Sequence, residues 1–423
     1  MRLLYSLLWW LAMPLVLARL WWRGRREPGY RRHMGERFGF YALHGTSDAT
    51  PVLWVHAVSV GETRAAQPMI DALLAGYPDH RVLLTHMTPT GRATGAALFA
   101  HHGDRVRQCY LPYDTGWMVA RFLRAHQPRV CLLIETEVWP NLVAQANRRA
   151  IPVALVNARL SARSLAKGQR LRSLFAAAAK GLACAGAQTA GDAARLQQLG
   201  VAPVTVTGSM KFDVVPPAVQ VAQGALWRGQ FGKRAVLLCA STRDGEEAAI
   251  LAALQTIALD ALLVIVPRHP HRFDAVADLI TAQGLTLARR STMGDGALAP
   301  EVQVLLGDSM GEMFAYYAAT DLAFIGGSLL PLGGQNLIEA CAVGTPVLVG
   351  PHTFNFADVT LAALAVGAGL RVDDAPAMLA SAQALLGDAA VLGAMAGAAR
   401  AFALQHRGAT ARTMHMLRPL INR

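Results

Sequence analysis

Cysteine is scarce in this 423-residue chain, and its spacing argues against two classes of protein. The five cysteines are widely separated, odd in number and without a C-x-x-C pair. They lie mostly within apolar runs, as Cys109, Cys131, Cys184, Cys239 and Cys341. Disulfide-stapled secreted domains and zinc modules both need cysteines paired at short spacing. We therefore expect reduced thiols in the core of a protein body that lies in the cytoplasm.

The apolar run at the start of the chain lacks the marks of a secretory leader. Leu3–Ala18 is uncharged over 16 residues, but positive charge follows the run and no small-residue cleavage site comes after it. A helix of this length spans roughly 24 Å, short of the roughly 30 Å hydrocarbon core, whereas extension to Trp22 reaches it if Arg19 snorkels. We expect residues 1–22 to be an uncleaved anchor helix that either spans the membrane or lies in its plane.

Positive charge is concentrated around this apolar run. The formal net charge is +12, and residues 1–40 hold eight arginines against two glutamates, which is half of the excess. Nucleic-acid-binding proteins spread basic residues over a reading surface with exposed aromatics, whereas these arginines follow directly on an apolar helix. We expect an anionic membrane surface as partner and no nucleic acid. Arginines on the C-terminal side of the helix predict that the rest of the chain lies in the cytoplasm.

Short apolar runs alternate with helical patterns in two successive sets, which predicts two α/β domains with parallel sheets. The first set is Val52–His56, Val82–His86, Val106–Leu111, Val130–Ile134, Val153–Val156 and Val204–Val206. The second set is Ala235–Cys239, Leu262–Val266, Val302–Leu306, Leu322–Ile325 and Pro346–Val349. A chain of this length that is 53% hydrophobic can bury two cores.

These patterns divide the chain into five predicted segments. They are an anchor helix over residues 1–22, a first domain over 23–212, a linker over 213–233, a second domain over 234–395 and a C-terminal helix over 396–423. The linker stretch contains Pro216-Pro217 and has little periodicity. The terminal helix is rich in alanine and could cross back to the first domain.

Ligands of parallel α/β sheets bind beyond the carboxyl ends of the strands, so the residues after each run are candidates for chemistry. Glu62 follows the first run, where it is either a general base or a first-turn carboxylate that suits the helix dipole. Glu135 and Glu137 follow the fourth run: either they face a site, or one caps the next helix while the other meets an arginine. Lys211 follows the last run of this domain, where composition alone favours a solvated lysine.

The second domain contains a glycine-rich stretch, Gly326–Phe356, directly after an apolar strand. Its four leading glycines allow backbone N–H groups to approach a ligand, and the next helix is predicted to be capped by Asn336 and to end at Gly344. A phosphate would suit that helix start, and Glu339 would accept hydrogen bonds from sugar hydroxyls. The alternative is an ordinary strand–helix turn with a glutamate at its edge.

Three further strand exits of the second domain are also polar. ASTRDG follows the first strand, Arg268 and His269 follow the second, and GDSMGEM, with Ser309 as a cap, follows the third. Four successive exits therefore offer small, hydroxyl or cationic groups to one edge, which predicts a nucleotide site. Because no acidic pair of the metal-binding kind follows a strand in this half, we expect no metal in the chemical step.

Eleven motifs follow one another along the chain: RLWWRGRREPGYRRHMGERFGFY, HAVSVGET, THMTPTGR, YLPYD, ETEVWPN, NARLSARS, VTGSMKFD, VPRHPHRF, GDSMGEM, GGSLLPLGGQNLIEA and GPHTFNF. In this order, and nearly from end to end, they resemble the family of 3-deoxy-D-manno-octulosonic acid (Kdo) transferases. Two places depart from it. Gln335 stands where some members have histidine, and Thr242-Arg243 stand where some have Thr-His.

The resemblance implies an inverting GT-B glycosyltransferase of lipopolysaccharide core biosynthesis, with two Rossmann-like domains facing across a cleft. The donor substrate would be CMP-Kdo, with no separate cofactor, and the first domain would hold the acceptor, a lipid A precursor (lipid IVA), at the cytoplasmic side of the cell inner membrane. The family pattern places the general base on Glu62 and gives Glu135 and Lys211 a part in stabilising the transition state. The implied CMP contacts are Arg268, His269, Met310, Gly311, Glu312, Asn336, Leu337, Ile338 and Glu339.

These roles fit elementary chemistry. A carboxylate can take the proton of a sugar hydroxyl, and Arg268, His269 and helix N-termini can stabilise departing CMP. Two alternatives stay open. One is a transferase that uses another nucleotide sugar on a membrane lipid acceptor. The other is a non-catalytic, membrane-bound nucleotide-sugar sensor, which would not need Glu62 in the opposing domain.

Overall fold

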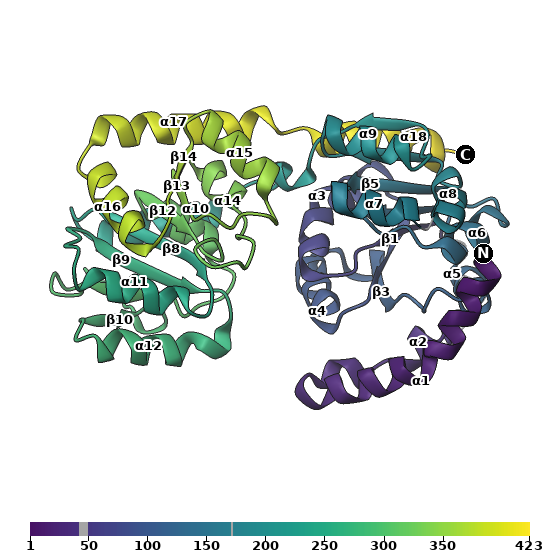
Figure 1. The fold of residues 1–423 in the computed structure, drawn as a ribbon, viewed down its shortest axis with the longest axis horizontal. Coiled ribbons are helices and arrows are strands. Elements are labelled where there is room, and N and C mark those ends of the chain that lie inside the picture. Colours follow the sequence, from purple (N-terminus) through teal and green to yellow (C-terminus); the bar gives the residue numbers. More distant parts are fainter. Residues whose placement is uncertain (42–49, 171) are drawn as a thin grey trace. The chain divides into compact units, whose positions relative to one another are not determined.

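The computed structural model describes residues 1–41, 50–170 and 172–423. The chain forms two compact units: Met1–Asp213 together with Arg407–Arg423, here called the first unit, and Val214–His406, the second unit. Within the described residues, each unit is built on a parallel sheet of seven strands with helices on both faces (Figure 1). The predicted α/β class with two Rossmann-like units is confirmed.

The first sheet has the strand order β3-β2-β1-β4-β5-β6-β7. Its strands are β1 (Val52–His56), β2 (Arg81–His86), β3 (Val106–Tyr110), β4 (Val130–Ile134), β5 (Val153–Ala158), β6 (Cys184–Ala187) and β7 (Val204–Val206). Val55 of β1 lies opposite Leu84 on one side and Leu132 on the other. The strand order reverses between β1 and β4, and such a switch point leaves a crevice at the carboxyl edge of a sheet.

Helices cover both faces of this sheet, which is why its strands are apolar runs without strict alternation. One face packs against α3 (Val60–Gly76), α4 (Pro89–Leu98) and α18 (Ala409–Ile421). The other packs against α5 (Gly116–His126), α6 (Pro140–Asn147), α8 (Arg172–Lys180) and α9 (Ala190–Gln198), while α7 (Ala162–Arg170) packs on α8 and α9. Leu53 and Val55 lie in the first core, and Trp54 between them lies in the second.

The second sheet has the order β10-β11-β9-β8-β12-β13-β14. Its strands are β8 (Val236–Thr242), β9 (Leu262–Pro267), β10 (Leu287–Arg289), β11 (Val304–Leu306), β12 (Leu322–Ile325), β13 (Val347–Val349) and β14 (Gly369–Arg371). Its helices are α10 (Ala218–Gln230), α11 (Glu246–Leu254), α12 (Phe273–Ala282), α13 (Met313–Ala318), α14 (Ile338–Val343), α15 (Ala357–Ala365), α16 (Ala375–Leu386) and α17 (Ala389–Gln405). Helices α11, α12 and α16 share one core.

The stretch expected as a linker, residues 213–233, is mostly helical. Helix α10 fills it and packs on α13 within the second unit. Its Trp227 is buried against the ring of Tyr316, with 5.0 Å between the ring centroids. Three glycines in or just beyond α10 had concealed its pattern. The chain re-enters the first unit at Arg407, so α18 belongs to the first unit.

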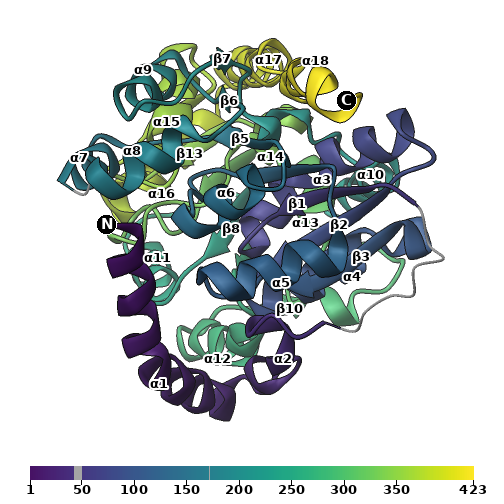
Figure 2. The ribbon, with the colours of Figure 1, turned by 90° about the vertical axis from the view of Figure 1, so that its right-hand side faces the viewer.

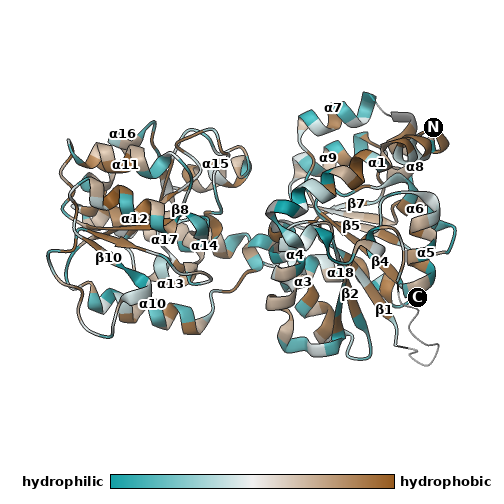
Figure 3. Ribbon diagram, turned by 90° about the horizontal axis from the view of Figure 1, so that it is seen from below, coloured by the Kyte–Doolittle hydropathy of each residue, from teal (hydrophilic) through white to brown (hydrophobic). Residues whose placement is uncertain are grey.

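The N-terminal segment consists of α1 (Arg2–Arg26), η1 (Pro28–Arg31) and α2 (Met34–Arg37). Figure 2 shows α1 bending as it runs along the first unit, and Pro14 inside it removes one backbone N–H. Met13 and Leu20 pack into a small cluster with Tyr113 and other residues of the first unit. Helix α1 is largely hydrophobic (Figure 3), and its Leu11 and Leu15 side chains are exposed.

All five cysteines lie among the described residues and are free and buried. Burial raises the pKa of each thiol. The expectation of reduced core thiols is therefore confirmed, and these cysteines are unsuited to nucleophilic chemistry.

Candidate active site

The carboxyl edge of the first sheet brings two of the predicted catalytic residues to one place. Glu62 lies in the first turn of α3, directly after β1, and Glu135 follows β4, the strand beside β1. Both therefore border the switch-point crevice of this sheet. The field of Glu135 also acts on the Glu62 carboxylate. The spacing along the sequence predicted these positions correctly.

Glu62 is held by its own loop. Its Oε2 accepts from the backbone N–H of Val58 at 2.7 Å, and its Oε1 accepts from the Ser59 hydroxyl at 3.1 Å. Burial, opposed by the Val58 hydrogen bond and assisted by Glu137 and Glu135, raises the pKa of Glu62 to about 7. Glu62 therefore fits both roles considered from the sequence. It is a carboxylate in the first turn of a helix, and it has the raised pKa of a candidate general base.

Glu135 and Lys211 form an ion pair. The Nζ of Lys211 lies 2.9 Å from Oε1 of Glu135, and both side chains are about three-quarters withdrawn from solvent. The backbone of Glu135 is in the left-handed region, with φ of 62°, a conformation that costs a non-glycine residue on the order of 1–3 kcal/mol and that clusters at functional sites. The composition-based expectation of a solvated lysine is wrong, because Lys211 is paired.

The alternative in which Glu135 or Glu137 caps the next helix is wrong. That both glutamates face a site stays a prediction, and the field of Glu137 does act on Glu62. Glu137 accepts from the indole N–H of Trp139 at 2.5 Å, and burial raises its pKa. The helix that follows, α6, is capped instead by Asp114, whose two oxygens accept from the backbone N–H groups of Asn141 and Leu142 at 3.0 and 2.8 Å. Asp114 belongs to the YLPYD motif. A carboxylate so far along the chain from the helix it caps gives no local sequence signal.

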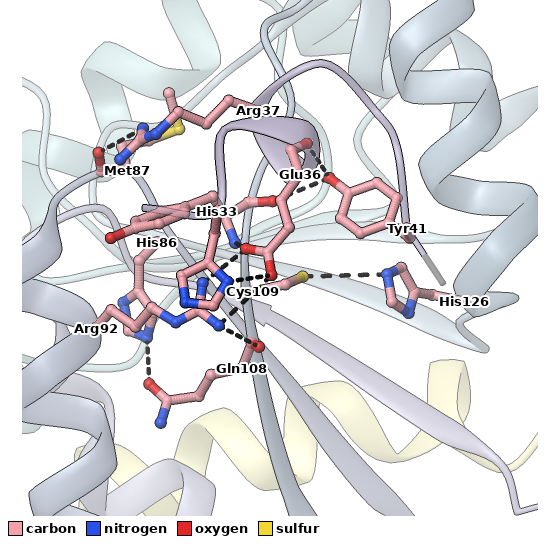
Figure 4. Close-up of polar contacts among 11 residues, drawn as sticks. His33, Glu36, Arg37, Tyr41, His86, Met87, Arg92, Gln108, Cys109 and His126 are labelled. Atoms are coloured by element: carbon pink, nitrogen blue, oxygen red, sulfur yellow. Dashed lines mark hydrogen bonds and ion pairs between the residues drawn. The ribbon is translucent and has the colours of Figure 1, made fainter. Parts of the chain in front are cut away.

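The loop that holds Glu62 is backed by a buried arginine from the N-terminal segment. Arg37 donates to the carbonyl of Met87 at 3.0 Å, the N–H of Met87 donates to the carbonyl of Val58 at 3.2 Å, and the N–H of Val58 donates to Glu62. Figure 4 shows the first of these contacts. The guanidinium carbon of Arg37 also lies 3.8 Å from the centroid of the Tyr110 ring. Sequence reasoning had treated Arg37 only as membrane-facing charge.

The neighbouring Glu36 joins the same N-terminal segment to the sheet. Its Oε2 lies 2.6 Å from Nη1 of Arg92 and accepts from the backbone N–H of Tyr110 at 2.8 Å, and its carbonyl accepts from the Tyr41 hydroxyl at 2.7 Å (Figure 4). This cluster links α2 to β3 and α4. The segment that follows the apolar helix is therefore an integral part of the first unit and supports the Glu62 loop.

A possible metal-binding group lies elsewhere in the first unit. Among the described residues, Asp71, His101 and His102 bring three ligand atoms within 4.8 Å of one another. They belong to α3 and to η2 (Ala100–Arg105), and Nε2 of His102 already donates to Oδ1 of Asp71 at 2.8 Å. The group does not stand at a strand exit.

In the second unit, the four polar strand exits predicted to converge do follow four adjacent strands. In the sheet, β11, β9, β8 and β12 are consecutive, and their exits carry the 307–313, 268–269, 243–245 and 326–336 stretches. Because β8 lies at the switch point of this sheet, these exits border its crevice. The predicted convergence is confirmed at the level of topology.

The glycine-rich loop after β12 folds back on itself. Gly327, Gly333 and Gly334 all have positive φ, and the N–H of Gly334 donates to the carbonyl of Gly327 at 2.7 Å. The loop is anchored by the buried Glu246, which accepts from the N–H groups of Gly327 and Leu329 at 2.6 and 3.0 Å. The sequence carries a local signal for Glu246, because it is an acidic residue in the first turn of a helix that follows a glycine.

The CMP contacts predicted in and just before α14 are of two kinds: some offer polar side-chain atoms to a ligand, and the others offer only backbone groups. The Nδ2 of Asn336 donates to Oε1 of Glu339 at 3.2 Å, and its Oδ1 accepts from the N–H of Ile338 at 3.1 Å. The helix itself begins at Ile338, with Leu337 at the cap position, and Gly344 ends it as predicted. Leu337 and Ile338 have buried side chains, so only their backbone groups could meet a ligand.

The remaining predicted contacts lie on the exits of β9 and β11. Arg268 is exposed, whereas His269 is half-buried and stacks on His271 at 5.5 Å between ring centroids. Burial, with Arg243 and Arg268 nearby, lowers the pKa of His269 and favours the neutral ring.

The 310–312 loop is exposed at Met310 and is supported from α10. Gln220 donates to the carbonyl of Gly311 at 2.9 Å, and Glu312 pairs with Arg290 at 3.2 Å. Ser309 bonds the Tyr316 hydroxyl at 2.8 Å and does not cap α13, whose cap residue is Glu312. The stretch expected as a linker thus supports part of the candidate donor edge.

Two open parallel sheets, each with polar groups at its switch point, are the architecture of GT-B glycosyltransferases. The fold is similar to a glycosyltransferase from Rickettsia africae, with a TM-score of 0.60 and 12% identity over 88% of this chain and 98% of that one. It is also similar to UDP-GlcNAc 2-epimerase from Neisseria meningitidis, with a TM-score of 0.59 and 17% identity over 87% of this chain and 100% of that one. Because these folds serve different reactions, the class follows from the fold but the reaction does not.

Sequence relatives narrow the class to a family. The family described as "3-Deoxy-D-manno-octulosonic-acid transferase (kdotransferase)" matches residues 32–214. The chain is 48% identical to 3-deoxy-D-manno-octulosonic acid transferase of Bordetella pertussis, over 96% of both chains. It is 34% identical to that of Haemophilus influenzae, over 100% of this chain and 99% of the relative. The chain belongs to the Kdo transferase family and is a glycosyltransferase.

Proposed function

We propose that this chain catalyses an inverting transfer of Kdo from CMP-Kdo to a lipid A precursor, lipid IVA, with Glu62 as the general base. The observation that carries the proposal is the Glu62 carboxylate, which lies at the switch point of the first sheet with its pKa raised to about 7. A general base is most effective when its pKa lies near the operating pH. Membership of the Kdo transferase family supports the identity of the transferred sugar.

The reaction needs one displacement. A hydroxyl of the acceptor sugar attacks the anomeric carbon of Kdo, its proton passes to a carboxylate oxygen of Glu62, and the bond from that carbon to the phosphate oxygen of CMP breaks. CMP leaves with the electron pair of that bond, and the configuration at the anomeric carbon inverts. Lys211, held by Glu135, supplies a preorganised positive charge that would stabilise the transition state.

We place CMP-Kdo at the carboxyl edge of the second sheet. The backbone N–H groups of the 310–312 loop suit phosphate oxygens, and the exposed Arg268 supplies the cation at this edge. In the glycine-rich loop, the N–H groups of Gly327 and Gly334 already donate to protein groups, so they are not assigned to the phosphate. The neutral His269 would hydrogen-bond without adding charge. The Asn336–Glu339 pair offers an amide and a carboxylate to nucleoside or sugar hydroxyls. Helix α14 has only six residues and contributes little dipole, so we do not assign the phosphate to its N-terminus.

Two alternatives keep the same architecture. A transferase with another nucleotide sugar would be distinguished by heat protection: CMP should raise the melting temperature, whereas UDP and GDP should not. A sensor without turnover would bind CMP-Kdo but release no CMP. The raised pKa of Glu62 favours the catalytic reading, because a sensor gains nothing from a carboxylate poised near neutral pH.

We further propose that α1 lies in the membrane plane at the cytoplasmic side of the inner membrane. One side of α1 is already committed to the first unit: Ser6 accepts from Asn141 at 3.0 Å, and Met13 and Leu20 are buried. The opposite side carries Leu3, Leu11 and Leu15, which are 86%, 68% and 74% exposed. The helix is long and apolar enough to span a bilayer, but a spanning orientation would break the contacts that its docked side makes with the first unit.

The acceptor and the product test the whole proposal. Purified protein should convert CMP-Kdo and lipid IVA into a product heavier by one or more Kdo residues, with release of an equal number of CMP molecules. Lipid IVA without donor and donor without lipid IVA are the controls. Release of CMP without any gain in acceptor mass would contradict the proposal, and so would transfer from a UDP-sugar under the same conditions.

A further inference from the structure

Lys211 is carried by a very short element. η3 (Met210–Asp213) is a single 3-10 turn, which makes few hydrogen bonds of its own, so the direction of the Lys211 side chain depends on what holds the turn. Met210 and Phe212, the residues on either side of Lys211, are buried. Lys211 therefore projects from a turn that is embedded in the first unit.

The first residue of η3 is fixed by Asn157. The backbone N–H of Met210 donates to Oδ1 of Asn157 at 3.0 Å. Asn157 lies near the end of β5, is fully buried, and has φ of 52°. Its own carbonyl accepts from the side chain of Gln188 at 2.9 Å. Glu135, which follows the adjacent strand β4, also has positive φ. Thus the residue that holds the turn and the residue that pairs with Lys211 both stand where neighbouring strands end.

The last residue of η3 is fixed by a different contact. The carboxylate of Asp213 accepts from the N–H groups of Gly408 and Thr410 at 2.6 and 2.5 Å. Gly408 is the N-cap residue of α18, so this carboxylate caps a helix of 13 residues. The chain leaves the first unit after Asp213 and re-enters it at Arg407. The Asp213 carboxylate therefore connects the segment that leaves the first unit to the segment that returns to it. η3 also packs against α3, the helix that carries Glu62.

We propose that Asp213 is a positioning residue for Lys211 in the transfer reaction. Asp213 holds the C-terminal end of η3 against α18 while Asn157 holds its N-terminal end, and the Lys211 ammonium is thereby kept on Glu135. Asp213 itself touches neither substrate nor reacting atoms. The inference rests on the proposed function, because it assigns Asp213 a task only if Lys211 contributes to transfer.

The test is a double-mutant cycle with Asp213→Ala and Lys211→Ala, measured as single-turnover transfer with CMP-Kdo and lipid IVA. Asp213→Ala alone should lower the transfer rate by about 10- to 10²-fold, because small misplacements of a catalytic group have effects of this size. CMP affinity should stay within about twofold of wild type, since this effect acts in the transition state. In the Lys211→Ala background the Asp213 change should cause no further loss.

A matched control separates positioning from loss of a helix cap. Asp388 caps α17 through the N–H groups of Ala390 and Val391, at 3.1 and 3.0 Å, and is far along the chain from Lys211. Asp388→Ala should lower the melting temperature about as much as Asp213→Ala but leave the transfer rate unchanged. Should Asp213→Ala fail to fold, Asp213→Asn, which keeps one acceptor oxygen, takes its place in the cycle with a smaller expected loss.

Three outcomes would overturn the proposal. Rate losses that multiply in the double variant would mean that Asp213 acts independently of Lys211. An Asp213 variant with the wild-type rate would show that the turn does not need this carboxylate. A Lys211→Ala enzyme with the wild-type rate would remove the role of Lys211 itself, and this result alone distinguishes failure of the proposed mechanism from failure of the positioning role.

Discussion

The Nζ atom of Lys211 lies 2.9 Å from Oε1 of Glu135, and this pair stands at the same sheet edge as Glu62. The arrangement concentrates one cation and several carboxylates around a single crevice. Glu135 holds the Lys211 ammonium in place. Burial and the charges of Glu137 and Glu135 raise the pKa of Glu62. The proposed general base and the proposed electrostatic stabiliser thus border one switch point.

Replacing Lys211 should slow the chemical step and leave the donor affinity unchanged. Loss of one preorganised stabilising group typically costs about 10²–10³-fold in rate, so Lys211→Ala should lower kcat by an amount in this range. Calorimetry should give the wild-type Kd for CMP. Lys167→Ala, at an exposed site on α7, is the matched control and should leave kcat unaltered. A Lys211 variant that keeps more than a third of the wild-type kcat would be incompatible with this role.

The pH profile should report the titration of Glu62. Because its pKa is raised to about 7, kcat/KM should rise with pH through about 7, and the Glu62→Gln variant should lose this limb. Stability should move in the opposite direction: a raised folded-state pKa means that the contribution of Glu62 is present below its unfolded pKa and is lost as pH rises through about 7. Urea unfolding of wild type and variant at pH 5.5 and pH 8 tests this. A wild type that gains stability relative to the variant at pH 8 would contradict it.

Asn336 and Glu339 should govern the affinity for CMP. Each loss of a well-placed hydrogen bond costs on the order of 1–3 kcal/mol, so Asn336→Ala and Glu339→Ala should each weaken CMP binding by about tenfold or more. Because their side chains are bonded at 3.2 Å, the double variant should lose less than the sum. Asp374→Ala, which removes the cap of α16 in the same unit, controls for loss of fold. Unchanged affinity in both single variants would rule out this location for the donor.

Membrane binding should depend on the outer leucines of α1. Changing Leu7, Leu11 and Leu15 to serine removes apolar area from the exposed side and leaves the docked stripe intact. Arginines after the helix should then hold the variant on anionic vesicles at about 1 kcal/mol each, an attraction that salt screens. In flotation, wild type should float at low and high salt and the triple variant at low salt alone. Flotation of the triple variant at high salt would show that another surface is the main attachment.

A second measurement separates an in-plane helix from a spanning one. Since all five native cysteines are buried, Arg2→Cys introduces a single exposed thiol near the N-terminus. An impermeant maleimide should label it in permeabilised cells but not in intact spheroplasts. Labelling in spheroplasts would place the N-terminus outside and contradict the in-plane arrangement.

Much of the fold was readable from local patterns. Strands such as β4 and β12 are continuous apolar runs, and the placement of Glu62 and of the glycine-rich loop follows from the rule that ligands meet the carboxyl ends of parallel strands. The missed strands are short or made of small residues. β6 reads CAGA, and β10 and β14 are three-residue edge strands, so none has the β-branched or aromatic run that marks a strand.

The contacts that support the site could not be read in the same way. Asp114 caps α6, Glu246 anchors the glycine loop, and Asp213 caps α18, and in each case the partner lies far along the chain. Such contacts depend on tertiary packing, which no local pattern specifies. Lys211 was misjudged on composition for the same reason, because its partner is Glu135.

The most direct test of the account is single-turnover transfer by Glu62→Gln. The substitution keeps the volume of the side chain but removes the proton acceptor, so the rate should fall by at least about 10²-fold while CMP affinity and melting behaviour at neutral pH stay close to those of wild type. Glu301→Gln, at an exposed site of the second unit, is the matched control and should keep the wild-type activity. A Glu62→Gln enzyme that retains more than half of the wild-type rate would contradict the assignment of Glu62 as the general base.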